Sequence, residues 1–177
     1  KIKLNKKLKD IVDSGNACGC LTVPQTLKKL NIDVEELYCD VDSTFPNHHP
    51  DPTVDSNLTE IVSKIKNGDF DLGMAFDGDA DRIVVIDEKG NIIRCDNLIC
   101  LFLPEVITET NKKIIFDVKC SESLEKMILN NGGKPLMWKT GHSLIKDKMK
   151  KENANFAGEM SGHIFFADDY YGYDDAL

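Results

Sequence analysis

Short apolar runs alternate with amphipathic segments along this chain. The apolar runs favour strands, and the amphipathic segments, with apolar residues three or four positions apart, favour helices. We predict strands at 10–13, 36–39, 72–76, 83–86, 92–93, 114–118, 136–138, 156–157 and 164–166. We predict helices at 22–30, 58–67, 96–108, 121–130 and 143–151. This order is typical of α/β architecture.

The clearest helix has Leu58, Ile61, Val62 and Ile65 at positions i, i+3, i+4 and i+7, and Asn67-Gly68 closes it. That spacing places the four apolar side chains on one face. A long loop with three prolines, 42–56, precedes this helix.

Two other helices carry position-specific signals. Thr22 is a candidate N-cap with Pro24 in the first turn, and Asp96 is a candidate cap for the helix at 96–108. Pro104 lies inside that helix and is expected to kink or split it, because proline lacks the backbone N–H.

A change of unit is predicted near 91–95, after the turn at Gly90. We expect two consecutive mixed α/β sandwich-like domains, 1–92 and 93–177, with truncated ends. The second unit stops within an element, and the chain begins without Met.

Composition narrows the function classes. The 177 residues are 41% hydrophobic and 29% charged, with a formal net charge of −8. That balance argues against a nucleic-acid or anionic-membrane partner, which requires a basic face, but it permits a phosphate held in a local basic pocket. No apolar stretch reaches the length of a membrane span, and no signal peptide is present, so we expect a cytoplasmic protein. The six cysteines form no C-x-x-C pair, which favours reduced thiols over zinc.

The most informative segment is an acidic turn that follows the predicted strand at 72–76. Asp77, Asp79 and Asp81 alternate with Gly and Ala, and Arg82 follows. Three adjacent carboxylates repel one another unless a cation neutralises them, and Mg²⁺ prefers such oxygen donors. Arg82 adds a fixed cation suited to phosphate. A solvated acidic turn is the plain alternative.

Two other interpretations of this turn fit the sequence less well. An EF-hand needs Gly at loop position 6 and helical flanks, but Arg82 occupies that position and the flanks are predicted strands. A haloacid-dehalogenase-type phosphatase would use Asp77 as the nucleophile, but Asp81 stands where that family usually has Thr or Val.

A second polar segment reads G-E-M-S-G-H at 158–163. Glu159 and Ser161 suit two neighbouring sugar hydroxyls, and His163 suits phosphate contact or proton transfer near neutral pH. An ordinary surface turn is equally compatible with these residues alone. Lys119 follows the predicted strand at 114–118, at the end of a strand where α/β sheets usually present ligands. A helix is predicted to begin at K-T-G-H-S, 139–143, which contains His142. The N-terminus of that helix favours an anion, and a simple helix cap is the alternative.

Together these segments resemble the α-D-phosphohexomutases, most closely bacterial enzymes that accept mannose and glucose phosphates. The pieces occur in the family's order and span nearly the whole chain. They are D-S-G-N at 13–16, F-P-N-H-H-P-D-P at 45–52, D-G-D-A-D-R at 77–82, F-D-V-K-C at 116–120, W-K-T-G-H-S at 138–143, G-E-M-S-G-H at 158–163 and D-D at 174–175.

The resemblance implies that the chain holds most of the second and third of four domains around one cleft. It implies that Asp77, Asp79 and Asp81 hold Mg²⁺. The implied catalytic residues are Arg82, Lys119 and His163, and the implied substrate-binding residues are Lys119, His142, Glu159, Ser161 and His163. The ligands would be hexose phosphates, and the partners the remaining domains of the same chain.

The implied reaction interconverts hexose 1-phosphate and hexose 6-phosphate through a bisphosphate and a phosphoserine. The family's phosphoserine loop and its fourth-domain phosphate loop are absent from these 177 residues, so we expect the chain alone to be inactive. The usual G-N-G-x-G also reads G-N-A-C-G, with Ala17 in place of a glycine. A phosphatase and a non-catalytic sugar-phosphate or metal-binding module remain the alternatives.

Overall fold

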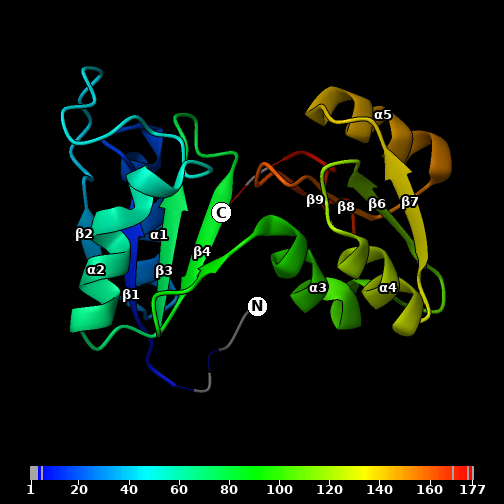
Figure 1. The fold of residues 1–177 in the computed structure, drawn as a ribbon, viewed down its shortest axis with the longest axis horizontal. Coiled ribbons are helices and arrows are strands. Elements are labelled where there is room, and N and C mark those ends of the chain that lie inside the picture. Colours follow the sequence, from blue (N-terminus) through cyan, green and yellow to red (C-terminus); the bar gives the residue numbers. More distant parts are fainter. Residues whose placement is uncertain (1–3, 5, 169, 175, 177) are drawn as a thin grey trace. The chain divides into compact units, whose positions relative to one another are not determined.

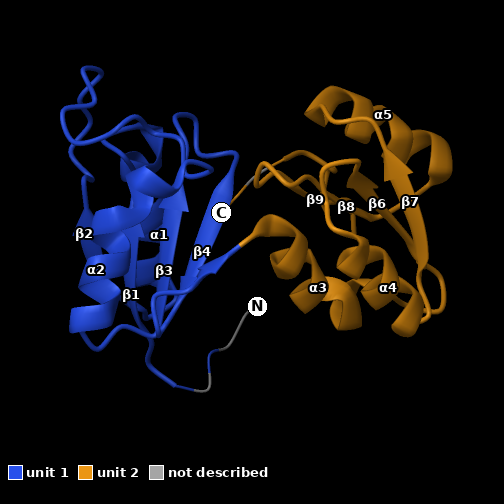
Figure 2. Ribbon diagram, viewed as in Figure 1, with its two compact units in different colours: residues 1–93, 177 blue, residues 94–176 orange. Residues whose placement is uncertain are grey.

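A computed structural model describes residues 4, 6–168, 170–174 and 176 of the chain. They fall into two compact units that divide between Ile93 and Arg94 (Figure 2). Each unit is a mixed sheet with helices on it, as expected from the alternating pattern (Figure 1). Within the described residues, no helix combines the length and apolar character needed to cross a membrane.

Unit 1 is built on a five-stranded sheet in the order β2-β1-β3-β4-β5. The strands are β1 (Lys9–Asp13), β2 (Asp33–Leu37), β3 (Leu72–Phe76), β4 (Ile83–Asp87) and β5 (Ile92–Ile93). β1 pairs in parallel with β2 and β3, whereas β4 is antiparallel to β3 and β5 is antiparallel to β4.

The helical segments of unit 1 are η1 (Cys18–Leu21), α1 (Val23–Lys29), η2 (Asp55–Leu58) and α2 (Thr59–Asn67). The chain crosses from β1 to β2 in one direction and from β2 to β3 in the other. Right-handed crossovers in opposite directions place α1 and α2 on opposite faces of the sheet. Ile61 and Ile65 of α2 belong to the same buried cluster as Ile11 and Ile86 of the sheet, which confirms the predicted apolar face.

Unit 2 has the same strand connectivity as the first four strands of unit 1, in a sheet of order β7-β6-β8-β9. Its elements are α3 (Cys95–Val106), β6 (Lys113–Asp117), α4 (Glu122–Asn130), β7 (Lys134–Trp138), α5 (His142–Glu152), β8 (Phe156–Gly158) and β9 (Ile164–Phe166). Ile145 and Met149 of α5 are buried with Ile115 and Phe165 of the sheet. β6, β7 and β8 are parallel, so their carboxyl ends lie at one edge.

Three sequence predictions need correction. The second strand spans Asp33–Leu37, not 36–39, because it pairs residue by residue with β1 and the chain turns away at Tyr38, where φ is +52°. Arg94, not Asp96, occupies the N-cap of α3, and Asp96 lies in its first turn. Pro104 does not split α3; the proline removes one backbone hydrogen bond, and the helix continues two residues further, to Val106.

Thr22 occupies the N-cap position of α1 as predicted, but its side chain makes no capping hydrogen bond. The Thr22 hydroxyl therefore does not account for the start of that helix. Pro24 lies in the first turn, where its missing N–H has no intrahelical partner to lose.

Candidate functional site

The acidic turn connects β3 to the antiparallel β4, so its two ends are fixed side by side. The backbone N–H of Ala80 donates to the carbonyl of Asp77 at 3.2 Å, and Ala80 has a φ of +63°. The tight turn points three alternating carboxylates to one small region. The flanking elements are strands, which excludes the EF-hand arrangement.

Asp77 anchors the turn. Its side chain is 2% exposed, and its Oδ1 accepts hydrogen bonds of 3.1 Å from the backbone N–H groups of both Asp81 and Arg82. Its Oδ2 accepts a 2.5 Å hydrogen bond from Nε of Arg82. Both oxygens are thus engaged in charge-assisted bonds, which suits an anchoring ligand better than a free nucleophile.

Asp77, Asp79 and Asp81 each offer one ligand atom, and these atoms lie within 4.8 Å of one another. Asp77 is buried, Asp81 half-buried and Asp79 exposed, so the group opens toward solvent. Hard carboxylate oxygens in such a group fit a divalent cation such as Mg²⁺.

Arg82 lies among carboxylates. Besides Asp77, its guanidinium is 3.9 Å from Asp51 and 4.0 Å from Asp81. Its side chain remains 29% exposed, so part of the cation faces solvent. A phosphate oxygen could approach that exposed part.

The loop that follows β1 packs closely against the acidic turn and against the proline-containing loop. The backbone N–H of Cys18 donates to the carbonyl of Gly78 at 3.2 Å. Gly15 has a φ of +52°, and a Cβ there would lie 3.0 Å from the Cβ of Pro50. Ala17 adopts an extended φ of −110°, so the replacement of the usual glycine creates no strain.

His48, in the proline-containing loop, contacts Asp13 at the end of β1. Nε2 of His48 lies 3.1 Å from Oδ2 of the buried Asp13, while Nδ1 lies 2.9 Å from the carbonyl of His49. Both ring nitrogens are therefore engaged within the protein. The sequence showed these residues only as matching family segments and gave no sign of the contact.

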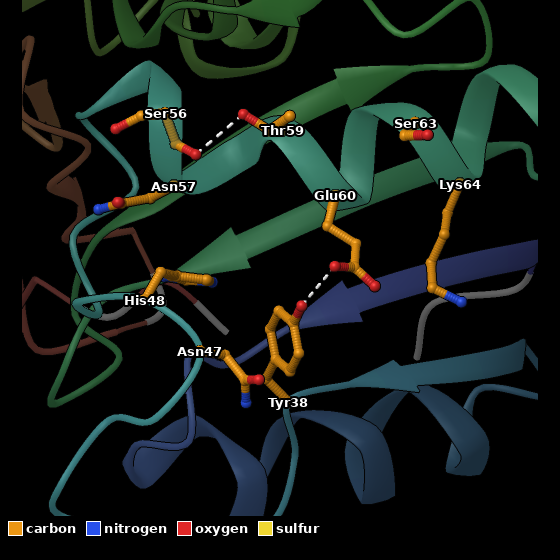
Figure 3. Close-up of a pocket in the computed structure, with 9 residues that line it drawn as sticks. All are labelled: Tyr38, Asn47, His48, Ser56, Asn57, Thr59, Glu60, Ser63 and Lys64. Atoms are coloured by element: carbon orange, nitrogen blue, oxygen red, sulfur yellow. Dashed lines mark hydrogen bonds between the residues drawn. The ribbon is translucent and has the colours of Figure 1, made fainter.

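His48 also lines a pocket of about 440 Å³ in unit 1, between the end of β2 and the start of α2 (Figure 3). Polar groups in its wall bond to one another: the Tyr38 hydroxyl donates to Glu60 at 2.5 Å, and the Thr59 hydroxyl to the carbonyl of Ser56 at 2.9 Å. The hydrogen bond to Glu60 is the main cause that raises the pKa of Tyr38 to about 12. Because these groups already have partners, we assign no ligand to the pocket.

In unit 2, residues 159–163 form the hairpin loop between β8 and β9. The N–H of Glu159 donates to the carbonyl of His163 at 2.9 Å and closes the loop. The Glu159 side chain is buried and its Oε1 accepts a 2.6 Å hydrogen bond from the N–H of Gly141, at the start of α5. Burial is the main cause that raises the pKa of this carboxyl, and the Gly141 N–H opposes the rise.

Asp174 links two of the predicted substrate-binding residues. Its Oδ2 lies 3.3 Å from Nδ1 of His142 and 3.2 Å from Nδ1 of His163, and its Oδ1 accepts a 2.7 Å hydrogen bond from Lys146. The two imidazoles stack with their centroids 5.7 Å apart. In the sequence, Asp174 belongs to a segment that matches the family, but nothing there indicates its role.

Lys119 is exposed in the turn after β6, and Ser161 is half-buried in the 159–163 loop. The predicted residues therefore form two groups. The metal-binding group and Arg82 lie on one turn of unit 1, and the others lie on the loops of unit 2.

Comparisons with known proteins give a consistent identity. A family model described as phosphoglucomutase/phosphomannomutase, alpha/beta/alpha domain II, matches residues 2–90, and the domain III model matches residues 95–177. A phosphomannomutase/phosphoglucomutase of Pseudomonas putida is 48% identical over 177 residues, which are 99% of this chain and 38% of that protein. The chain thus spans well under half the length of this relative.

Solved structures agree with the sequence matches. A phosphoglucomutase/phosphomannomutase family protein from Burkholderia thailandensis superposes with a TM-score of 0.95 at 46% identity, covering 99% of this chain and 39% of that one. An N-acetylphosphoglucosamine mutase from Aspergillus fumigatus, solved with GlcNAc-6P and magnesium, has a TM-score of 0.67 at 18% identity over 90% of this chain and 36% of that one. The second match supports the fold alone.

Proposed function

The chain belongs to the phosphoglucomutase/phosphomannomutase family, and on that premise we propose that it supplies the metal-binding and sugar-recognition domains of a Mg²⁺-dependent phosphohexomutase. The observation that carries the proposal is the group of three carboxylate ligand atoms within 4.8 Å on one turn, with Arg82 beside them.

Asp77, Asp79 and Asp81 would hold the Mg²⁺, which when bound neutralises negative charge on phosphoryl oxygens. Arg82 would orient the transferring phosphate through its exposed guanidinium N–H groups. Both contributions are electrostatic, which is what phosphoryl transfer chiefly requires.

The loops of unit 2 would recognise the hexose. Glu159 and Ser161 would bind neighbouring sugar hydroxyls, while Lys119, His142 and His163 would complete a polar and cationic wall. One carboxylate oxygen of Glu159 already accepts from the Gly141 N–H, which leaves its second oxygen for a hydroxyl. His163 and His142 share Asp174, which would hold both imidazoles in place for the phosphate or for a proton.

The proposed reaction is a reversible exchange between hexose 1-phosphate and hexose 6-phosphate. A phosphoserine outside these 177 residues would give its phosphoryl group to the substrate and form a bisphosphate, which would turn over and return its other phosphate. We therefore expect no mutase turnover by the 177-residue chain alone, and measurable turnover would overturn that expectation.

Two titrations test the assignment of sites. For the metal, calorimetry and amide NMR shifts at 77–82 follow Mg²⁺ binding to the chain and to Asp79→Asn and Asp81→Asn. Each substitution should weaken binding at least tenfold, because it removes one anionic ligand. Glu88→Gln, which alters an exposed carboxylate outside the turn, should bind Mg²⁺ as the parent chain does. Unchanged affinity in Asp81→Asn would refute the metal assignment.

For the sugar, the chain is titrated with glucose 1-phosphate and mannose 1-phosphate, with and without Mg²⁺. We expect weak binding that is lost in Glu159→Ala and kept in Glu125→Gln, an exposed position on α4. Equal binding by both variants would show that the 159–163 loop does not recognise the sugar.

A further inference from the structure

The carboxylate of Asp117 lies fully buried at the carboxyl end of β6, with 0% exposure. β6 is an inner strand of unit 2, with β7 on one side and β8 on the other (Figure 1). Asp117 pairs with Trp138 at the end of β7, and the preceding Phe116 pairs with Gly158 at the end of β8. Three loops therefore leave the sheet beside this one side chain.

Each of the three loops donates one hydrogen bond to it. The Thr140 hydroxyl donates to Oδ2 at 2.8 Å, and the backbone N–H of Met160 donates to Oδ1 at 3.1 Å. The Cys120 thiol donates to Oδ1 at 3.2 Å. Burial and the nearby Asp117 charge raise the pKa of this thiol, so it keeps the proton that it donates.

The donors adjoin the residues assigned above to hexose phosphate recognition. Cys120 closes the turn that presents Lys119, since its N–H donates to the Asp117 carbonyl at 3.1 Å. Thr140 lies two residues before His142. Met160 lies between Glu159 and Ser161. One buried anion thus connects all three parts of the proposed recognition surface.

We propose that Asp117 is a positioning residue, which sets the mutual placement of these three loops and thereby the affinity for hexose phosphate. The link to affinity rests on the function proposed above. An Asn side chain removes the charge that strengthens all three bonds, and its NH₂ group cannot accept, so the Thr140 hydroxyl would have to accept in place of donating. The three loops are then held only by weaker hydrogen bonds to a neutral group.

A purely structural role is the alternative, and Asp96 provides the matched control. Asp96 is also a buried carboxylate of unit 2, 4% exposed. Its Oδ2 accepts from the N–H of Ser121 at 3.2 Å and its Oδ1 from the N–H of Asn97 at 2.8 Å. It therefore holds helix starts and neither Thr140 nor Met160.

The experiment compares Asp117→Asn with Asp96→Asn in the ¹⁵N-labelled chain, at a temperature where both variants are folded. Amide hydrogen exchange is measured without ligand, and glucose 1-phosphate is then titrated. In Asp117→Asn we expect exchange to accelerate at least tenfold at both Gly141 and Met160, and the affinity for glucose 1-phosphate to fall about tenfold. Asp96→Asn should leave exchange at Gly141 and Met160 unchanged even where its melting temperature falls.

A second pair keeps the test decisive if Asp117→Asn does not fold. Thr140→Ser retains the hydroxyl donor and should behave as the parent chain, whereas Thr140→Val removes it and should accelerate exchange at Gly141 and weaken binding. Equal behaviour of the Ser and Val variants, or equal effects of the two Asn variants, overturns the proposal.

The outcomes also separate this inference from the proposed function. Accelerated exchange in both loops with unchanged sugar phosphate affinity would overturn the link between positioning and recognition. Absence of sugar phosphate binding by the unsubstituted chain would count against the function proposed for unit 2, while the exchange data would still decide whether Asp117 orders the loops.

Discussion

Asp10 is a buried carboxyl in β1 whose ionisation destabilises unit 1. It is 1% exposed, and among the described residues its Oδ1 has no hydrogen-bond partner. Burial raises its pKa from 3.8 to about 6, the charge of Asp71 adds to the rise, and Lys6 opposes it.

The sign follows from proton linkage. Because the folded state binds this proton more tightly than the unfolded chain, the stability of unit 1 falls as pH rises from about 4 to about 6. A rise in pKa from 3.8 to about 6 corresponds to about 3 kcal/mol, at about 1.4 kcal/mol per pKa unit. This penalty is absent below about pH 4 and complete above about pH 6.

Asp10→Asn removes the titrating group and keeps its shape. Urea unfolding is followed through the NMR amide signals of β1, which report on unit 1 alone, at pH 4.0 and pH 7.5. On going from pH 4.0 to pH 7.5, the variant should gain about 2 to 3 kcal/mol relative to the parent chain. Any fixed penalty of the buried amide cancels in this comparison, because it is the same at both pH values.

Glu88→Gln serves as the control, since that side chain is 59% exposed and should show no comparable change. An equal difference between Asp10→Asn and the parent chain at both pH values would refute the reasoning. So would a variant that gains stability relative to the parent chain on acidification.

Three further predictions concern packing, thiol reactivity and pH. Gly158→Ala should destabilise unit 2 by about 1 to 3 kcal/mol in thermal denaturation, because its Cβ would lie 2.4 Å from Cδ1 of Ile99. The same change should cost less in an Ile99→Ala background, although Ile99→Ala is itself destabilising because Ile99 is fully buried. Iodoacetamide at pH 8 should alkylate the exposed Cys18 well before Cys39, whose pKa burial raises to about 11, as peptide mass spectrometry can check. Burial raises the pKa of Asp174, but the hydrogen bond and charge of Lys146 outweigh it, so the pKa is lowered and unit 2 loses stability when Asp174 is protonated in acid. Asp174→Asn should therefore lose less stability below pH 4 than the parent chain. Parallel acid titrations by NMR check this, and an equal loss in both proteins would contradict it.

Local patterns were sufficient for the elements whose side chains repeat with a clear period. α2 and β3 were predicted from apolar residues at helical spacing and from a continuous apolar run. The acidic turn was likewise visible, because three carboxylates at alternate positions after a strand are costly without a cation. In each case the physical cause lies within about ten residues of chain.

The position of β2 could not be predicted from its local sequence pattern. It carries Asp33, Glu35 and Glu36, and only Leu37 among its five residues is buried, so its own pattern is weak. Its place is set by pairing with β1, through residues 24 positions away in the chain. A short-range pattern cannot report that pairing.

The carboxylates of the site also divide into those whose role is visible in the local sequence and those whose role depends on distant residues. The sequence determined which acidic residues stand together on the metal turn, since their spacing is local. It placed Asp117 and Asp174 in segments that match the family but assigned neither residue a role. Asp117 is bonded to donors 23 and 43 residues away, and Asp174 to a lysine 28 residues away. Only the tertiary structure brings these partners together. Asp174 pairs with Phe165 of β9, and the donors to Asp117 meet because parallel strands end at one edge of the sheet regardless of the length of chain between them.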